Sequence, residues 1–293
     1  MMKIYNLGSL NIDYVYSVDH FVTAGETLSS AKMEIFPGGK GLNQSVALAK
    51  AGAEVIHGAI VGNQGEFLVE TLKESGVNIQ RIKKSDSTNG HAIIQVDNSG
   101  QNCILLYAGT NHDIDRNYIE EFLSDAQKDD IILLQNETSG LDIVFQIANQ
   151  KQMQIVFNPS PFENSILDLP LSYVKWWFCN EIEGELLFGS NDPLKITENF
   201  IKKYPHSNLV LTLGKDGCIF KNKETFIKQA AFEAKAVDTT AAGDTFSGYF
   251  ISMISQGKTI ADALRIASMA SAVTVSRKGA SVSIPYINEL ETT

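Results

Sequence analysis

Short apolar runs separated by amphipathic segments constrain the fold of this chain more than any other feature. From about residue 110 onward such runs recur, at residues 131–134, 155–157, 176–178 and 209–211. A strand buried on both faces is apolar along its whole length, whereas a half-buried strand alternates. Apolar runs that alternate with helical segments are typical of βαβ units around a parallel sheet. We therefore expect an α/β protein, with residues 53–62 in the same sheet.

Two regions interrupt this rhythm and have no helical pattern of their own. Residues 12–36 contain a strand-like segment from Tyr14 to Val18. Residues 89–109 have the pattern of a hairpin, with a turn at residues 97–100. We expect both regions to form a small β-sheet outside the main one. Because an exposed sheet edge needs covering, this favours a homodimer in which two such sheets pair.

Composition excludes several classes of partner. The 293 residues carry a formal net charge of −10, and the nearest basic clusters are pairs, at residues 83–84 and 202–203, which argues against nucleic acid. The apolar stretches are shorter than a membrane span, and the first residues lead directly into a strand-like segment rather than a signal peptide. Three widely spaced cysteines resemble neither a disulfide framework nor a metal site, which suits a reducing cytoplasm.

Small residues mark the point at which a loop enters a helix near the C-terminus. Ala241, Ala242 and Gly243 precede an apolar run of helical spacing that stops at Gly257. The amides of a first helical turn have no intrahelical partner, and small side chains let an anion approach them. Asp244 adds a carboxylate, so the segment has what phosphoryl transfer to an alcohol requires. A plainer explanation is an acidic residue that caps the helix.

A second glycine-rich segment, residues 37–44, opens another helix, which Gly52 ends. Its glycines permit a positive φ and close approach to a ligand, and Lys40 and Asn43 offer donors on the same turn. The segment matches neither the Walker A pattern nor Gly-x-Gly-x-x-Gly. A tight turn with a solvated Lys40 is the plainer explanation.

Together these segments resemble the signatures of the pfkB, or ribokinase-like, family of carbohydrate kinases. The resemblance extends along most of the chain, through residues 8–13, 38–44, 158–161, 180–183, 212–217, 237–246 and 277–280. It implies one kinase domain over residues 1–293, with a three-layer αβα core and a mostly parallel central sheet. The segments 12–36 and 89–109 would then form a β-sheet lid over the sugar.

The resemblance also implies roles for individual residues. Asp244 matches the general base, and Ala241, Ala242 and Gly243 match the residues whose amides receive the developing charge. The positions that match sugar contacts are Asn11, Asp13, Gly39, Lys40, Asn43 and Glu137.

Further matches concern ATP and its ions. Asn180 and Glu183 match residues that steer the Mg²⁺ nucleotide, and Thr212, Gly214 and Gly217 match the loop around it. Ser268 stands where relatives often carry Asn or His beside the adenine. The positions that match a monovalent-cation site, for K⁺, are Asp238, Thr240, Thr274, Arg277, Gly279 and Ser283.

The resemblance thus implies an ATP-dependent kinase of a primary sugar hydroxyl. Asn11, Lys40 and Asn43 favour ribose, phosphorylated on its 5-hydroxyl. Leu42 replaces a small residue of the family pattern and is expected near the sugar, which leaves deoxyribose, a nucleoside or a hexose as alternative substrates. A non-catalytic sugar-binding regulator is a further alternative, against which the intact Gly243 and Asp244 argue.

Overall fold

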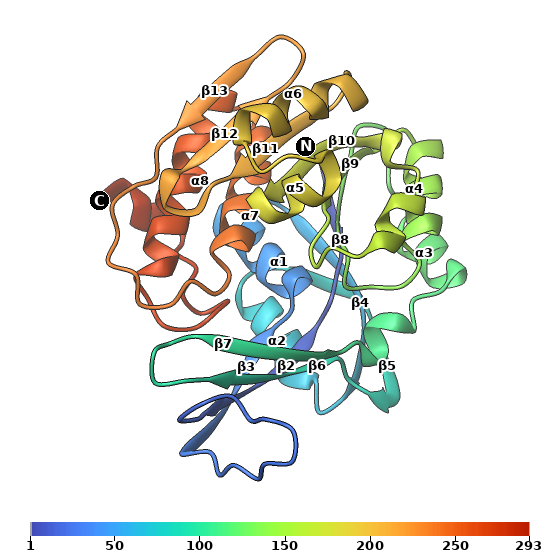
Figure 1. The fold of residues 1–293 in the computed structure, drawn as a ribbon. Coiled ribbons are helices and arrows are strands. Elements are labelled where there is room, and N and C mark those ends of the chain that lie inside the picture. Colours follow the sequence, from blue (N-terminus) through green and yellow to red (C-terminus); the bar gives the residue numbers. More distant parts are fainter. Residues whose placement is uncertain (1, 293) are drawn as a thin grey trace.

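The computed structural model describes residues 2–292 and has a nine-stranded central sheet with helices on both faces (Figure 1). The strand order is β13-β12-β11-β10-β9-β8-β1-β4-β5, parallel except for the antiparallel pairs β11–β12 and β12–β13. The predicted α/β fold is confirmed. The strands are β1 (Ile4–Leu7), β4 (Val55–Asn63), β5 (Asn78–Thr88), β8 (Ile131–Gln135), β9 (Gln154–Asn158), β10 (Val174–Asn180), β11 (Asn208–Thr212), β12 (Cys218–Lys221) and β13 (Phe226–Gln229).

Two separate hydrophobic cores hold the helices against the sheet. One core packs α1 (Lys40–Lys50), α2 (Glu66–Glu74), α7 (Ala242–Ser255) and α8 (Ile260–Val275) on one face. The other packs α3 (Arg116–Phe122), α4 (Leu141–Gln150), α5 (Glu181–Phe188) and α6 (Pro193–Lys203) on the opposite face. The strands supply alternate side chains to both cores, which explains their continuous apolar runs. Short 3₁₀ helices complete the chain: η1 (Gly109–His112), η2 (Asn164–Asp168), η3 (Leu171–Tyr173), η4 (Gly214–Asp216) and η5 (Ile287–Thr292).

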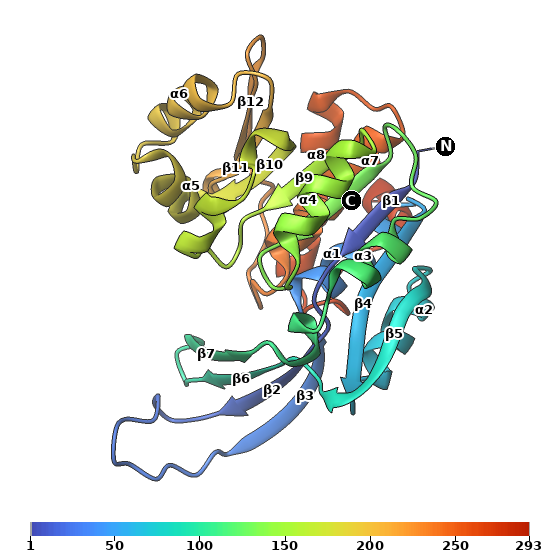
Figure 2. The ribbon, with the colours of Figure 1, turned by 90° about the vertical axis from the view of Figure 1, so that its right-hand side faces the viewer.

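The second sheet has four strands and projects from one end of the core (Figure 2). Its order is β3 (Lys32–Gly38), β2 (Asn11–Ser17), β6 (His91–Val96) and β7 (Asn102–Tyr107). β6 and β7 form the predicted hairpin, and β2 is parallel to β6. The small sheet expected from the sequence is therefore present, and we call these four strands the lid sheet.

The strand order reverses direction at β1. From β1 the chain adds β4 and β5 on one side, and it then adds β8 and the later strands on the other. Ligands of open α/β sheets bind at such a switch point, beyond the carboxyl ends of the strands. Asn11 follows β1 and Glu137 follows β8, so both lie at this point. Within residues 2–292, no helix has the length and apolar character needed to cross a bilayer.

Candidate active site

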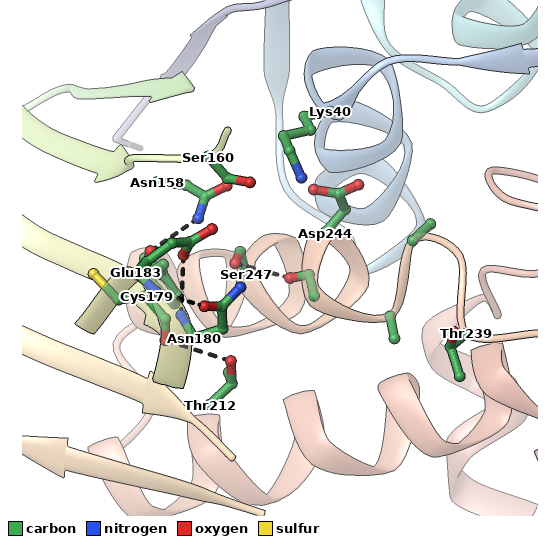
Figure 3. Close-up of a pocket in the computed structure, with 14 residues that line it drawn as sticks. Lys40, Asn158, Ser160, Cys179, Asn180, Glu183, Thr212, Thr239, Asp244 and Ser247 are labelled. Atoms are coloured by element: carbon green, nitrogen blue, oxygen red, sulfur yellow. Dashed lines mark hydrogen bonds between the residues drawn. The ribbon is translucent and has the colours of Figure 1, made fainter. Parts of the chain in front are cut away.

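A pocket of about 250 Å³ lies where the first turns of α1 and α7 face the carboxyl ends of β9, β10 and β11 (Figure 3). Parallel strands all present their carboxyl ends at the same edge, so residues distant in sequence meet here. The lining residues are Lys40, Asn158, Ser160, Phe178, Cys179, Asn180, Glu183, Thr212, Thr239, Ala241, Ala242, Gly243, Asp244 and Ser247.

Asp244 lies in the first turn of α7 with only 8% of its surface exposed. Asn43 Nδ2 donates to Asp244 Oδ2 at 3.1 Å, and Gln44 Nε2 donates to Oδ1 at 2.9 Å. Both donors lie in α1. They reach Asp244 because Gly248 lets α7 pack closely on that helix. A Cβ on Gly248 would lie 2.5 Å from the Cβ of Ala47. The two glycine-rich segments of the sequence therefore meet at one carboxylate.

Lys40 brings a positive charge to the same place. Its ammonium group points toward the Asp244 carboxylate in Figure 3. Burial alone would lower the pKa of Lys40, but the carboxylates of Asp244, Glu137 and Glu183 outweigh it and hold that pKa above its usual value. Lys40 is therefore charged at neutral pH.

The first turn of α7 is open to a ligand. Ala241 precedes it with φ of 62°, a conformation that L-residues seldom adopt, and no side chain caps the helix. The Ala242 amide donates to the Thr239 carbonyl at 3.3 Å. The next two amides, those of Gly243 and Asp244, lie in the first turn and so have no intrahelical acceptor. A Cβ added to Gly243 would have nothing within 4 Å. The pocket therefore has room for an anion beside this glycine.

The residues that match sugar contacts are gathered at the junction of core and lid sheet. Asn11 Oδ1 accepts from Asn111 Nδ2 at 2.7 Å. Asp13 occupies space that exists only because residue 38 is glycine, since a Cβ there would lie 2.0 Å from Asp13 Oδ2. Gly39, with φ of 97°, turns the chain into α1.

Two partly buried carboxyl groups belong to this set. Glu137 Oε2 accepts from the Lys40 amide at 3.0 Å and from the Ser9 hydroxyl, which ties the segments that follow β8 and β1 to the start of α1. Burial raises the pKa of Glu137, against the opposing effect of the Lys40 ammonium. Burial, with the nearby charge of Glu137, raises the pKa of Asp13 to about 7.

The residues that match nucleotide contacts are only partly assembled around the pocket. Asn180 and Glu183 line it and also form a capping box for α5, with each side chain accepting from the other residue's amide. Glu183 is buried, so it is not on a solvated helix face. Thr212 lines the pocket as well, whereas Gly214 and Gly217 belong to the turn between β11 and β12. Ser268 does not line it and lies buried on α8 beside the Cys218 thiol.

The residues that match a cation site surround the loop before α7. Asp238 accepts from the Thr240 amide at 2.9 Å and from the Gly279 amide at 3.0 Å. Thr274 bonds to Thr245 in α7. Arg277 forms an ion pair with Glu289, and Ser283 donates to the Ala280 carbonyl. Through residues 2–292 we find no group of three or more His, Cys, Asp or Glu side chains suited to a metal ion.

One expectation from the sequence is wrong and several lining residues were not predicted. Leu42, which was expected near the sugar, has no exposed surface and does not line the pocket: it is completely buried in the core shared with α7, and its amide donates to the Ser9 carbonyl. The side chains of a helix's first turn point in different directions, and the side chain of Leu42 points into the core. Asn158, Ser160 and Ser247 line the pocket without having been assigned to it. Only their positions in the sequence could have indicated this, since Asn158 ends a strand and Ser247 follows Asp244 by almost one helical turn.

Comparison with known proteins agrees with this geometry. The model of the pfkB family carbohydrate kinases matches residues 1–287. A ribokinase of Haemophilus influenzae is 35% identical, over 97% of this chain and 95% of its own length. The crystal structure of a Cryptococcus neoformans ribokinase in complex with ADP superimposes with a TM-score of 0.88 at 30% identity, over 100% of this chain and 99% of the other. An Arabidopsis thaliana ribokinase complexed with ribose and ATP gives 0.87 at 25% identity, with 99% and 98% covered. The chain belongs to the pfkB family of carbohydrate kinases.

Proposed function

We propose that this protein is a ribokinase, which transfers the γ-phosphate of ATP to the 5-hydroxyl of ribose. The observation that carries the proposal is the position of Asp244. Its buried carboxylate lies in the same helical turn as Gly243, whose missing side chain leaves space for an anion. A base beside an anion site suits transfer of a phosphoryl group to an alcohol.

In this proposal Asp244 takes the proton of the sugar's primary hydroxyl as that oxygen attacks the phosphorus. The first-turn amides of α7, above all that of Gly243, stabilise by hydrogen bonding the charge that develops on the phosphoryl oxygens. The bond to the leaving ADP oxygen breaks as the new bond forms. The ammonium of Lys40, which is charged at neutral pH, lies where it can offset the negative charge gathered around Asp244.

Asn11, Asp13, Asn43 and Glu137 are the proposed partners of the ribose hydroxyls. They are short polar side chains held by other parts of the protein, as Asn11 is by Asn111. Such fixed geometry is what recognition of a hydroxyl-rich ligand requires. The lid sheet, which supplies Asn11 and Asp13, would exclude water from the sugar and so favour phosphorylation over hydrolysis of ATP.

Mg²⁺ fits the residues of the pocket, and Glu183 with Asn180 would hold it, directly or through water. Mg²⁺ keeps several waters and is usually bound by one or two carboxylates together with substrate phosphates, so a sparse set suffices. When bound, the ion would neutralise charge on the phosphate oxygens. Both side chains are already held by their mutual capping bonds, so their positions beside the pocket are fixed.

K⁺ is the proposed activating ion beside the first turn of α7. Asp238 gathers Thr240 and Gly279 around one carboxylate. Carbonyl oxygens of this loop and of the turn after α8 would supply the remaining ligands. An ion there would fix the loop that leads into Ala241.

A homodimer through the lid sheets is also proposed. Apolar side chains are exposed on this sheet, with Leu105 at 67% and Ile104 at 55%. An exposed apolar sheet with a free edge strand favours cover by a second copy. Light scattering of the wild type and of Leu105→Lys tests the dimer, which the charged residue should dissociate.

The free thiols Cys103, Cys179 and Cys218 suit the reducing cytoplasm, which we propose as the location.

The test of the function is ATP turnover by the purified protein against ribose, 2-deoxyribose, hexoses and nucleosides. Ribose should be phosphorylated with the highest kcat/KM, and NMR should locate the phosphate on the 5-oxygen. Preference for another substrate of the panel would move the protein to a sister kinase. ATP turnover with none of them would refute the proposal.

A further inference from the structure

A row of three buried amide side chains leads from Asp244 into the core, and the proposed function gives it no role. The row consists of Gln44, Gln135 and Asn6. Gln44 lies in α1, is completely buried and does not line the pocket. Its Nε2 donates to Asp244 Oδ1 at 2.9 Å, while Asn43 donates to the other carboxylate oxygen. A carboxylate so far removed from water needs such donors in place of solvent.

The next residues of the row fix which end of the Gln44 amide faces the carboxylate. Gln44 Oε1 accepts from Gln135 Nε2 at 2.8 Å, and the same Nε2 donates to Asn6 Oδ1 at 3.0 Å. Asn6 Nδ2 in turn donates to Ser45 Oγ and to the Gly41 carbonyl, each at 2.8 Å. An amide turned the wrong way would present oxygen to a carboxylate and repel it. Because Gln135 occupies Oε1, Gln44 presents its donor to Asp244.

The row joins four elements around the switch point of the sheet. Asn6 lies in β1, Gln135 ends β8, Gln44 lies in α1 and Asp244 begins α7. Asn6 is fully buried and Gln135 is 1% exposed. Close packing makes these bonds possible, since a Cβ on Gly8 would lie 2.4 Å from the Gly41 Cα. The orientation of Asp244 is therefore tied to the sheet as well as to the neighbouring helix.

Packing alone would not require amides at these positions. An apolar side chain fills similar space without partners, whereas a buried amide is unfavourable unless it is hydrogen-bonded. The row is also uncharged apart from Asp244. Even His57, whose Nδ1 meets Ser45 Oγ at 2.8 Å, has its pKa lowered by burial to about 3 and is neutral. Of the charged groups around Asp244, Lys40 lines the pocket with it, and Glu137 accepts a hydrogen bond from the Lys40 amide. The row thus ends on a single carboxyl group, that of Asp244, which points to a role in holding it.

We propose that Gln44 is a positioning residue, which with Gln135 and Asn6 holds the Asp244 carboxylate in the orientation that accepts the sugar's proton. The proposal rests on the role of Asp244 proposed above. Gln44 acts through that carboxylate and not through the substrates. A misplacement of about 1 Å in a reacting group can lower the rate by about 10²-fold.

The test is Gln44→Met, which keeps the length of the side chain and removes the donor. We expect kcat to fall by about 10- to 100-fold, while KM for sugar and for ATP changes less than about twofold. The matched control is Ser252→Ala. Ser252 is also buried, lies on α7 and donates to the Ala51 carbonyl at 3.0 Å, so it links the same two helices far from Asp244. The control should lower the melting temperature and leave kcat unchanged.

Gln44→Glu supplies a readout that a structural role would not move. It puts a second carboxyl group against Asp244, and like charges so close share a proton. The acid limb of the kcat–pH profile should therefore move to higher pH. Crystal structures of the wild type and of Gln44→Met give a readout without catalysis, in which the Asp244 carboxylate should be rotated in the variant.

Wild-type kcat in Gln44→Met, an unchanged pH profile in Gln44→Glu, or an unmoved carboxylate would each overturn the proposal. A loss of kcat in Ser252→Ala equal to that in Gln44→Met would do so as well, since helix packing would then explain both. Failure of the proposed function appears elsewhere, in a wild type that does not phosphorylate ribose. The variants are compared on whichever substrate the wild type turns over, and the crystal structures need none. If Gln44→Met does not fold, Gln44→Glu decides.

Discussion

Gly243→Ala should separate the stability of this protein from its activity. Residue 243 is in the first turn of α7, has no positive φ, and has open space where a Cβ would point. Alanine is therefore compatible with the fold, and it loses less backbone entropy than glycine on folding. The gain is about 0.5–1 kcal/mol, or roughly 1–2 °C in melting temperature for a chain of this size.

Activity should change in the opposite direction. The new methyl group would occupy the space proposed for the phosphoryl group, and the loss of one anion-site contact typically lowers kcat by about 10²–10³-fold. Calorimetry and a coupled ADP-release assay measure the two effects on the same preparations. Gly248→Ala is the contrasting control, because its Cβ would lie 2.5 Å from that of Ala47 and should destabilise the fold by about 1–3 kcal/mol. A Gly243→Ala enzyme with wild-type kcat would refute the anion site.

Three further predictions concern the sugar and cation sites. The pKa of Asp13 is raised to about 7 in the folded protein, so its contribution to the free energy of unfolding is lost as the pH rises from about 4 to 7. Asp13→Asn should remove that part of the pH dependence of stability in denaturant titrations. An unchanged dependence of stability on pH in the variant would contradict the burial of this carboxyl group. Replacing Na⁺ by K⁺ at constant ionic strength should raise kcat, and the increase should vanish in Asp238→Ala; a flat response of the wild type would exclude the cation site. Ribose should exceed 2-deoxyribose in kcat/KM by about tenfold or more, since an unpaired buried polar group costs about 1–3 kcal/mol, and Asn11→Ala should narrow that gap; equal efficiencies in the wild type would remove Asn11 from hydroxyl recognition.

The sequence predicted those elements whose own residues determine them. The runs at residues 131–134 and 209–211 are apolar because both faces of β8 and β11 are buried, so they could be recognised singly. β5 could not, because its charged side chains are held at the surface by ion pairs such as Lys83 with Glu121 and Arg81 with Asp125. Its strand conformation comes from pairing with β4, which is a tertiary effect.

The candidate site shows the same division. The two glycine-rich segments could be read from local chemistry, because loop-to-helix transitions with small residues are visible in sequence. The direction of individual side chains could not. Leu42 follows Gly41 in the same turn, yet it is buried in the core, while Gln44 reaches Asp244. Only the packing of α1 on α7 determines which of these residues faces the site.

The central claim is that Asp244 is the general base, and Asp244→Asn tests it most directly. The amide keeps the shape of the side chain but cannot take the proton of the sugar hydroxyl. The account predicts a fall in kcat of about 10²–10⁴-fold, with ribose still bound in calorimetric titration at an affinity within a few-fold of the wild type. Retention of more than half of the wild-type kcat at neutral pH would contradict it.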